Sequence, residues 1–396
     1  MFEETFVIEE IGELYGLKVY IDYDGPKLFS CFDQNFKNYV AVLTDMSENY
    51  DKWLLVECSD ERLNELEEDK ISLYNFFKEP ENGFLWLVTE DFEKMRNVAK
   101  TITPKDLTDK DLPQRGVYLN TKDKTGNLLL EKTKIYAHLT GSDIVNVSIA
   151  YRGNHKKEIP AELLGDVLKG FQKILNAEYG GNRKQLRNEE KEKLTLYVVG
   201  VYDGSFGVRL KSCRVSVPLF EKQPIDTPVS KFLVELFDFL EIDDVQNLAI
   251  FLETKNKRIL QHYIDFLRKL RSSDSHINYC FASPMGRIKS GSLSIEKINE
   301  KYEKITKELE KRTDIKTLSG EFVGVNIENM SFEFITTEKE KIKGKISDEL
   351  RNFTFQVPKH AQIIVEFSES YNEVNQAIET KYTLLNITYL NSGEDI

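Results

Sequence analysis

Short apolar runs separated by turn-forming residues fill the first hundred positions of the chain. Within these runs apolar and polar residues alternate, or the residues are apolar throughout, which is typical of β-strands. Asp24-Gly25-Pro26 is the clearest turn between two runs. The spacing predicts an antiparallel β-meander with strands at 17–23, 27–32, 39–44 and 53–58. A short helix through Leu63 and Leu66, a second helical turn at 71–77 and a strand at 85–88 are predicted to follow.

Two β-branched and aromatic runs in the middle of the chain meet at Asp203-Gly204-Ser205. An Asp-Gly pair between alternating apolar residues predicts a β-hairpin, because glycine accepts the positive φ of a tight turn. Around this hairpin, spacings of three and four between apolar residues predict amphipathic helices. We expect a hairpin at 195–202 and 206–211, strands at 144–150 and 277–282, and helices at 160–175, 229–242, 245–252, 259–270 and 294–312.

The last eighty residues change to a period of two. Short strands are predicted at 321–327, 331–336, 341–346, 363–367 and 380–389, with Gly320, Gly324 and Gly344 at bend positions. This pattern is typical of a small closed or nearly closed barrel, of the SH3-like or OB-like kind.

A polar stretch at 100–134 shows no sustained periodicity and contains several prolines and glycines, which favours a domain boundary. A chain of 396 residues also exceeds the size at which one hydrophobic core stops growing. We therefore expect an α+β protein: a β-rich N-terminal domain at 1–103, a linker at 104–134, an α+β middle domain with a central hairpin and a helical bundle at 135–316, and a small barrel-like domain at 317–396.

The formal net charge of -12 works against non-specific binding to nucleic acid or to an anionic membrane. No stretch approaches the ~18 apolar residues of a membrane span, and the first residues do not form a secretion signal. The four cysteines contain no CxxC pair, so free thiols in a reducing compartment are the simplest interpretation. We expect a cytoplasmic protein without a metal site or a cofactor.

The first candidate for a ligand site is the hairpin tip, with Gly204, Ser205, Phe206, Gly207 and Arg209. Glycine loops present backbone N–H groups to phosphates when they lead into a helix. Here the loop leads into a strand, so a structural hairpin is the favoured interpretation. No GxSxG, HExxH or P-loop motif occurs, and the five histidines stand singly.

Carboxylate metal sites are the remaining enzyme hypothesis. Metal-dependent nucleases of one large class place an acid and an acid-x-Lys tripeptide around Mg²⁺. Two such tripeptides occur, Glu253-Thr254-Lys255 and Glu379-Thr380-Lys381. In so charged a chain, solvated surface charge is the favoured interpretation of both.

An aromatic cluster in three successive predicted helices suggests an interface. It contains Phe232, Phe237, Phe239, Phe251, Tyr263 and Phe266. Exposed apolar patches of this size normally mark an interaction surface, which predicts a homodimer or a protein partner bound through residues 229–271. The alternative is that these helices pack on one another as a domain core.

Several segments resemble a family of bacterial proteins that carry a domain of unknown function. The similar N-terminal segments are YDGPKLFSC, YVAVLTD, WLLVECSDERLNELEEDKISLYNFF and GFLWLV, and the later ones are GSFGVRL and GEFVGVNIENMSFEF with IKGKISDEL. The resemblance implies a fold and an association with anti-phage or other conflict systems, and it carries over no catalytic residue.

These observations together favour a non-enzymatic sensor or regulatory subunit that binds a ligand or a protein. A metal-dependent nuclease effector is the first alternative. Nucleic-acid binding without catalysis is the second, and the acidic net charge disfavours it.

Overall fold

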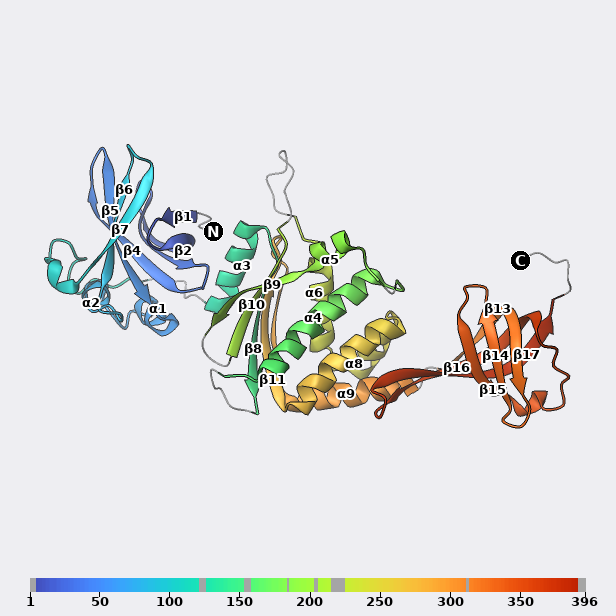
Figure 1. Ribbon diagram of the computed structural model, residues 1–396. Coiled ribbons are helices and arrows are strands. Elements are labelled where there is room, and N and C mark those ends of the chain that lie inside the picture. The colour runs from blue at the N-terminus through green and yellow to red at the C-terminus, as the bar shows by residue number, and fades with distance from the viewer. Residues whose placement is uncertain are drawn as a thin grey trace. The chain divides into compact units, whose positions relative to one another are not determined.

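The computed structural model describes residues 5–120, 126–152, 158–183, 185–202, 206–214, 225–310 and 313–390 (Figure 1). The fold is α+β, with an antiparallel N-terminal sheet and a closed C-terminal barrel, which confirms the predicted fold class. The chain divides into two compact units. Residues 1–160, 185–238 and 275–293 form the first unit, and residues 161–184, 239–274 and 294–396 form the second. The domain limits derived from the sequence stay a prediction.

The N-terminal sheet is an antiparallel meander in which each strand pairs with the next along the chain. Its strands are β1 (Thr5–Ile8), β2 (Gly12–Asp22), β3 (Pro26–Asp33), β4 (Asn38–Met46), β5 (Tyr50–Cys58), β6 (Leu85–Asp91) and β7 (Arg96–Ile102). The five strands predicted in this region are present. The polar β7 and the short β1 were not predicted.

Two short helices cover one face of this sheet. They are α1 (Asp60–Glu67) and α2 (Leu73–Lys78), and the side chains of Ser59 and Ser72 accept hydrogen bonds from their first-turn N–H groups. Side chains alternate across a strand, so one set of alternating residues of β3, β4 and β5 points to the face that these helices cover. The shared core includes Leu28, Val40, Leu54, Leu63, Phe76 and Phe77.

The sheet curls around its other face until β1 meets β7. The Glu9 N–H donates to the Asn97 carbonyl at 3.3 Å, and Asn97 Nδ2 donates to the Val7 carbonyl at 3.1 Å. The Ala99 N–H donates to the Glu10 carboxylate at 2.7 Å. Register irregularities along β2 increase the local twist. The inner face is therefore enclosed by the meander itself.

A second antiparallel sheet has the order β12-β11-β8-β10-β9. Its strands are β8 (Ile144–Tyr151), β9 (Leu196–Tyr202), β10 (Phe206–Ser212), β11 (Ser275–Ala282) and β12 (Ile288–Leu293). Helix α3 (Leu128–Thr140) packs on β8 and β11. Helix α6 (Ser230–Glu241) places Phe237 against Tyr279, with the ring centroids 4.5 Å apart. The helices therefore contact two of the central strands of this sheet.

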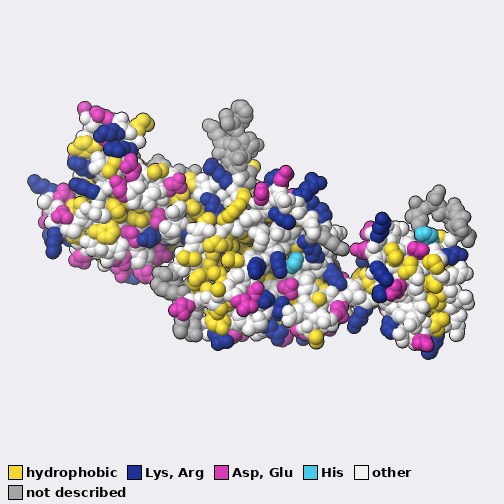
Figure 2. Space-filling model, in the orientation of Figure 1, with side chains coloured by type: hydrophobic (Ala, Val, Ile, Leu, Met, Phe, Trp, Pro, Cys, Tyr) yellow, Lys and Arg dark blue, Asp and Glu magenta, His cyan; other side chains and the backbone are white. Residues whose placement is uncertain are grey.

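Strand β9 forms one edge of the second sheet, and its exposed side chains are apolar. Val198 is 54% exposed and Val201 is 66% exposed, and Tyr197 and Val199 are exposed as well. Figure 2 shows the hydrophobic patch over this strand. Among the described residues no strand pairs with the outer edge of β9.

The second unit combines a helical layer with the barrel. Its helices are α4 (Ala161–Gly180), α7 (Val245–Glu253), α8 (Lys257–Ser272) and α9 (Ile295–Glu310). Helix α4 packs along α8, where Phe171 meets Phe266 with the ring centroids 5.4 Å apart.

The first unit contains two further short helices among its described residues, η1 (Pro104–Asp106) and α5 (Asn188–Leu194).

The barrel has the closed order β13-β14-β15-β17-β16, in which β15 and β17 are parallel. Its elements are β13 (Thr313–Asn326), β14 (Ser331–Thr336), β15 (Lys341–Ile346), η2 (Asp348–Leu350), β16 (Lys359–Asn372) and β17 (Ala377–Tyr389). An all-antiparallel meander would lack this parallel pair. Between the two predicted barrel types, the Greek-key order favours the OB kind.

The turn between β16 and β17 extends beyond the barrel and packs on the helical layer. Gln261 of α8 donates to the Gln376 carbonyl and accepts from the Ile378 N–H. Tyr302 of α9 donates to the Glu373 carboxylate at 3.1 Å. In OB barrels this turn often contacts nucleic acid, whereas here it contacts helices α8 and α9 of the same chain.

The aromatic cluster of residues 229–271 lies largely inside the protein. Phe237, Phe239, Tyr263 and Phe266 are buried, and Phe239 contacts both Phe251 and Tyr263. These side chains therefore do not form the exposed stripe that suggested an interface, and an assembly through residues 229–271 stays a prediction. No helix in the described part of the chain has the length and hydropathy to cross a membrane.

Candidate functional site: a pocket inside the curled sheet

Part of the hairpin site predicted from the sequence lies outside the described residues, namely Gly204 and Ser205. Phe206 and Gly207 begin β10, where Gly207 pairs with Tyr202. A Cβ atom at Gly207 would collide with the Tyr202 ring, so the glycine lets this ring lie across the strand. Gly207 is therefore needed for the packing of the Tyr202 ring against β10.

Arg209 is a buried junction residue, and only 1% of its surface is exposed. Its Nε donates to Asn146 Oδ1 at 2.9 Å, and its Nη1 donates to the Gln34 carbonyl at 2.8 Å. The guanidinium lies 3.3 Å from the centroid of the Phe36 ring. Burial lowers the pKa of Arg209 to about 10, which leaves it charged at neutral pH. Arg209 thus joins β10 to the β3–β4 turn.

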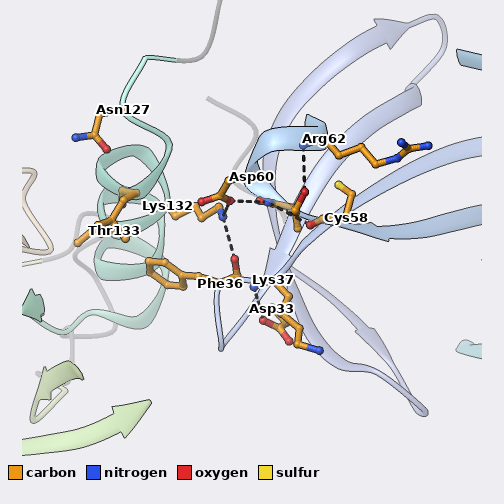
Figure 3. Close-up of polar contacts among 12 residues, drawn as sticks. Asp33, Phe36, Lys37, Cys58, Asp60, Arg62, Asn127, Lys132 and Thr133 are labelled. Atoms are coloured by element: carbon orange, nitrogen blue, oxygen red, sulfur yellow. Dashed lines mark hydrogen bonds and ion pairs between the residues drawn. The ribbon is translucent and has the colours of Figure 1, made fainter. Parts of the chain in front are cut away.

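Lys132 makes a second connection to the β3–β4 turn, this one from α3 (Figure 3). Its Nζ donates to the Phe36 carbonyl at 2.9 Å and to Asp60 Oδ1 at 2.8 Å. Burial is the main cause that lowers the Lys132 pKa below its usual value. Phe36 has a positive φ of 67°, and the Asp33 carboxylate accepts the Asn35 and Lys37 N–H groups of this turn. Two buried cations therefore hold one strained turn.

The two acid-x-Lys tripeptides take part in local contacts. Lys255 forms a buried ion pair with Glu178 at 2.9 Å. Glu379 accepts hydrogen bonds from Asn372 and Asn375, each at 2.8 Å. Among the described residues, no group of three or more histidine, cysteine or acidic side chains is arranged to hold a metal ion. The structure does not bring either tripeptide into a metal-binding cluster within that part of the chain.

A pocket of ≈ 240 Å³ lies inside the curl of the N-terminal sheet, and each of the seven strands contributes to its wall. The floor is apolar. It is formed by Phe6, Ile8, Leu14, Phe29, Cys31, Ala41, Trp53, Leu55 and Val88. These residues belong to the core of the inner face, where Phe29 contacts Phe6 and Trp53 with ring centroids 5.3 Å and 5.5 Å away.

Polar side chains line the other part of the pocket. They are Asp24, Lys27, Asp51, Glu90 and Asn97. Asp51 of β5 and Glu90 of β6 are directly opposite each other in the sheet. At the apolar floor, burial raises the pKa of the Cys31 thiol, so this group is neutral at physiological pH. The pocket thus combines an apolar interior with acidic groups.

This pocket could not be predicted from the sequence, because its residues come from seven separate strands. Alternation in each strand showed which residues share a face, but the same pattern fits a flat sheet. One signal was available in the sequence: both tryptophans of the chain, Trp53 and Trp86, alternate onto the inner face. Large aromatic residues on the face away from the helices indicate a second enclosed layer.

Part of the chain matches a known protein family. The family of unknown function DUF6575 matches residues 2–211, slightly more than half of the chain. The matched region ends in β10, so it contains the curled sheet, α3 and Arg209. No curated protein and no solved structure is significantly similar to the chain. The chain therefore belongs to this family of unknown function, and the pocket lies within the region that defines the family.

Proposed function

We propose that this protein is a non-enzymatic sensor or regulatory subunit that binds a small apolar molecule inside the curled N-terminal sheet. The single observation that carries this proposal is the ≈ 240 Å³ pocket with walls from seven strands. An apolar cavity of ~150 Å³ is large enough to bind benzene. Pockets with apolar walls and a few polar groups are typical ligand sites.

The regulatory part of the proposal is supported by the continuity between the pocket wall and α3. Cys31 lines the pocket, and its neighbour Phe32 lies on the other face of β3. The Phe32 ring contacts Tyr15, and the Tyr15 ring contacts Tyr136 of α3 at 5.0 Å between centroids. A ligand that shifts β3 would therefore displace this row of packed aromatic rings, which connects the pocket wall to α3 and the second sheet.

The cellular setting of the proposal rests on the resemblance in the sequence. The resemblance supports a bacterial protein that is associated with an anti-phage system, and the four cysteines without a CxxC pair support a cytoplasmic setting. The acidic net charge favours a protein or small-molecule partner over nucleic acid.

Binding can be tested with 1-aminoanthracene, an apolar fluorophore that is neutral at pH 7. Trp53 lines the pocket, so binding should quench tryptophan emission and raise the emission of the probe. Ala41→Phe should fill the pocket, because Ala41 lines it and is buried. We expect this variant to weaken probe binding at least about tenfold, or ~1.4 kcal/mol.

Val7→Phe is the matched control, because Val7 is exposed on β1 and does not line the pocket. It adds the same ring outside the curl and should bind the probe as the wild type does. Far-UV circular dichroism would verify that both variants are folded. Equal probe binding by wild type and a folded Ala41→Phe variant would show that the proposal is wrong, as would no binding by the wild type.

A further inference from the structure

We propose that a second cleft of this protein binds a neutral sugar. The cleft lies on the second sheet beside the first turn of α3, and it shares no lining residue with the pocket inside the curled sheet. Its volume of ≈ 340 Å³ is within the ~300–1,000 Å³ that is usual for ligand sites. The inference goes beyond the proposed function, because it assigns a second site and a second class of ligand.

The base of the cleft is formed by two rows of residues that are opposite one another in β8, β11 and β12. One row consists of Ser148, Asn278 and Ser292, and the other consists of Asn146, Cys280 and Ser290. Both rows are on the same face of the sheet, because side chains alternate along each strand. Asn127 and Leu129 at the start of α3 form a wall above them.

The base is hollow because its side chains are small. Serine occupies three of the six positions in the two rows, and Gly207 of β10 is opposite Ser148. The Tyr202 ring borders the hollow and lies over Gly207, since a Cβ atom there would collide with three adjacent ring atoms. A tyrosine combines an apolar ring with a polar hydroxyl. This combination suits a sugar, which has an apolar C–H face and a rim of hydroxyl groups.

Several polar side chains of the cleft are available to a ligand. Within the described part of the chain, five of them have no hydrogen bond to another protein group, namely Ser148, Tyr202, Asn278, Ser290 and Ser292. A hydroxyl both donates and accepts, and an amide does the same through its nitrogen and its oxygen. Sugar hydroxyls have the same double capacity. A ligand with several hydroxyl groups can therefore bond to many of these side chains at once.

The floor of the cleft also contains an amide that the protein holds in place. Asn146 is only 1% exposed, and its Oδ1 accepts a hydrogen bond from Arg209 Nε at 2.9 Å. Its Nδ2 donates to Thr133 Oγ1 of α3 at 2.8 Å. Groups that are already ordered reduce the entropy that binding costs. The polar floor is therefore fixed before a ligand arrives.

The lining is uncharged, which limits the class of ligand. Although 30% of the residues in the chain are charged, no charged side chain lines the cleft among the described residues. Burial raises the pKa of the Tyr202 hydroxyl and of the Cys280 thiol, so both are neutral at physiological pH. A charged ligand would lose hydration here and gain no ion pair. The lining therefore favours a neutral sugar over a sugar phosphate.

A nucleobase fits this lining less well than a sugar. Proteins bind the flat faces of unpaired bases mainly by stacking on aromatic rings or guanidinium groups. Here most of the lining consists of serine and asparagine side chains. Neutral nucleosides are therefore the competing ligands in the test.

Saturation-transfer-difference NMR can test binding with the methyl glycosides of glucose, galactose, mannose and N-acetylglucosamine. We expect at least one of these neutral sugars to bind. The 6-phosphate of the same sugar should bind at least about tenfold more weakly, because the cleft offers no cation to the phosphate. Adenosine and uridine should bind more weakly than the sugar.

Two variants test the location of the site. Asn278→Leu removes the amide at similar size and should weaken sugar binding about fivefold, the usual contribution of one hydrogen bond. Ser148→Phe should fill the hollow and abolish binding. Asn64→Leu is the matched control, because Asn64 is exposed on α1 and does not line the cleft. It should bind the sugar as the wild type does, and far-UV circular dichroism would verify that all three variants are folded.

The outcomes are distinct from those of the first proposal, because 1-aminoanthracene reports on the pocket inside the curled sheet. If none of the four sugars binds, or if a nucleoside or the sugar phosphate binds tighter than they do, the inference is wrong. If sugar binding is unchanged in folded Asn278→Leu and Ser148→Phe, the assignment to this cleft is wrong.

Discussion

Several buried cations of this protein are held by backbone carbonyl groups. Lys132 and Arg209 donate to the carbonyls of Phe36 and Gln34, and Lys301 donates to those of Phe239 and Ile242. Carbonyl oxygens accept these hydrogen bonds but do not neutralise the charge, so the protein bears a desolvation cost at Arg209 and Lys301. Lys132 also forms an ion pair with Asp60, which offsets part of its cost. In return, each cation joins segments that are far apart in the sequence.

Lys301 provides a pH test of this cost. It is 3% exposed, and burial is the main cause that lowers its pKa from the usual 10.5 to about 8. Between these two values, the folded protein can release the proton while the unfolded chain keeps it. The folded state is therefore stabilised as the pH rises. Relative to Lys301→Met, the wild type should gain about 2–3 kcal/mol of unfolding free energy between pH 8 and pH 10.5.

Urea denaturation at several pH values measures this difference, and the comparison with Lys301→Met cancels the titration of other groups. The control is Lys307→Met, because Lys307 is exposed on the same helix. Its unfolding free energy should follow that of the wild type across the range. A constant gap between the wild type and Lys301→Met would contradict the burial argument.

At the scale of elements, close approach of strands explains two of the three barrel glycines. A Cβ atom at Gly344 would collide with the Tyr382 carbonyl and lie 2.7 Å from the Phe332 ring. A Cβ atom at Gly320 would meet the backbone of Thr336 at 2.8 Å. At Gly324 the nearest atom is the Glu333 Cβ at 3.5 Å, an ordinary contact. The barrel thus needs glycine where β15 meets β17 and where β13 meets β14.

Gly344→Ala should therefore destabilise the barrel by roughly 1–3 kcal/mol, the usual cost of overpacking. Gly324→Ala is the matched substitution in the same barrel and should change stability by less than about 0.5 kcal/mol. Thermal unfolding followed by circular dichroism would compare the two variants. Equal losses for both would mean that the close approach at Gly344 is not the reason for the glycine.

The barrel strands could be predicted from the sequence more closely than α3. Strands β14 and β15 match the predicted ranges, since their residues alternate between core and solvent. Helix α3 was missed because both of its sides are buried. Lys132 and Thr133 lie inward beside Ile135 and Tyr136, so no amphipathic period marks this helix. Because of its polar residues, the start of this helix was predicted to belong to the linker at 104–134, although these residues make buried hydrogen bonds.

The candidate site could not be predicted because it depends on the curl of the sheet. Alternation along β3 puts residues such as Phe29 and Cys31 on one face of the sheet. Closure depends on contacts such as the hydrogen bonds of Asn97 with Val7 and Glu9, which join residues about ninety positions apart. No local pattern encodes such contacts. The buried role of Arg209 was hidden for the same reason, because its partner Gln34 is distant in the sequence.

At the scale of the whole molecule, the exposed edge of β9 can pair with a strand of another molecule and cause self-association. Natural edge strands usually carry a charge or a proline that blocks pairing with another chain, and β9 has neither. Val201→Lys should therefore reduce self-association, which static light scattering at increasing protein concentration would detect. Val374→Lys is the control, because Val374 is more exposed but lies in a turn. An equal effect of both would indicate general hydrophobicity rather than strand pairing.

The long β16–β17 hairpin belongs to two hydrophobic layers at once. One part closes the barrel through Ile363 and Val365, and the other carries Tyr371, whose ring meets Tyr302 of α9. Mechanical force applied to the barrel would therefore pass along the paired strands into the helices. One end of the hairpin is part of the barrel, and the other end is held by hydrogen bonds to Gln261 of α8 and Tyr302 of α9. The barrel therefore cannot separate from α8 and α9 unless these hydrogen bonds break.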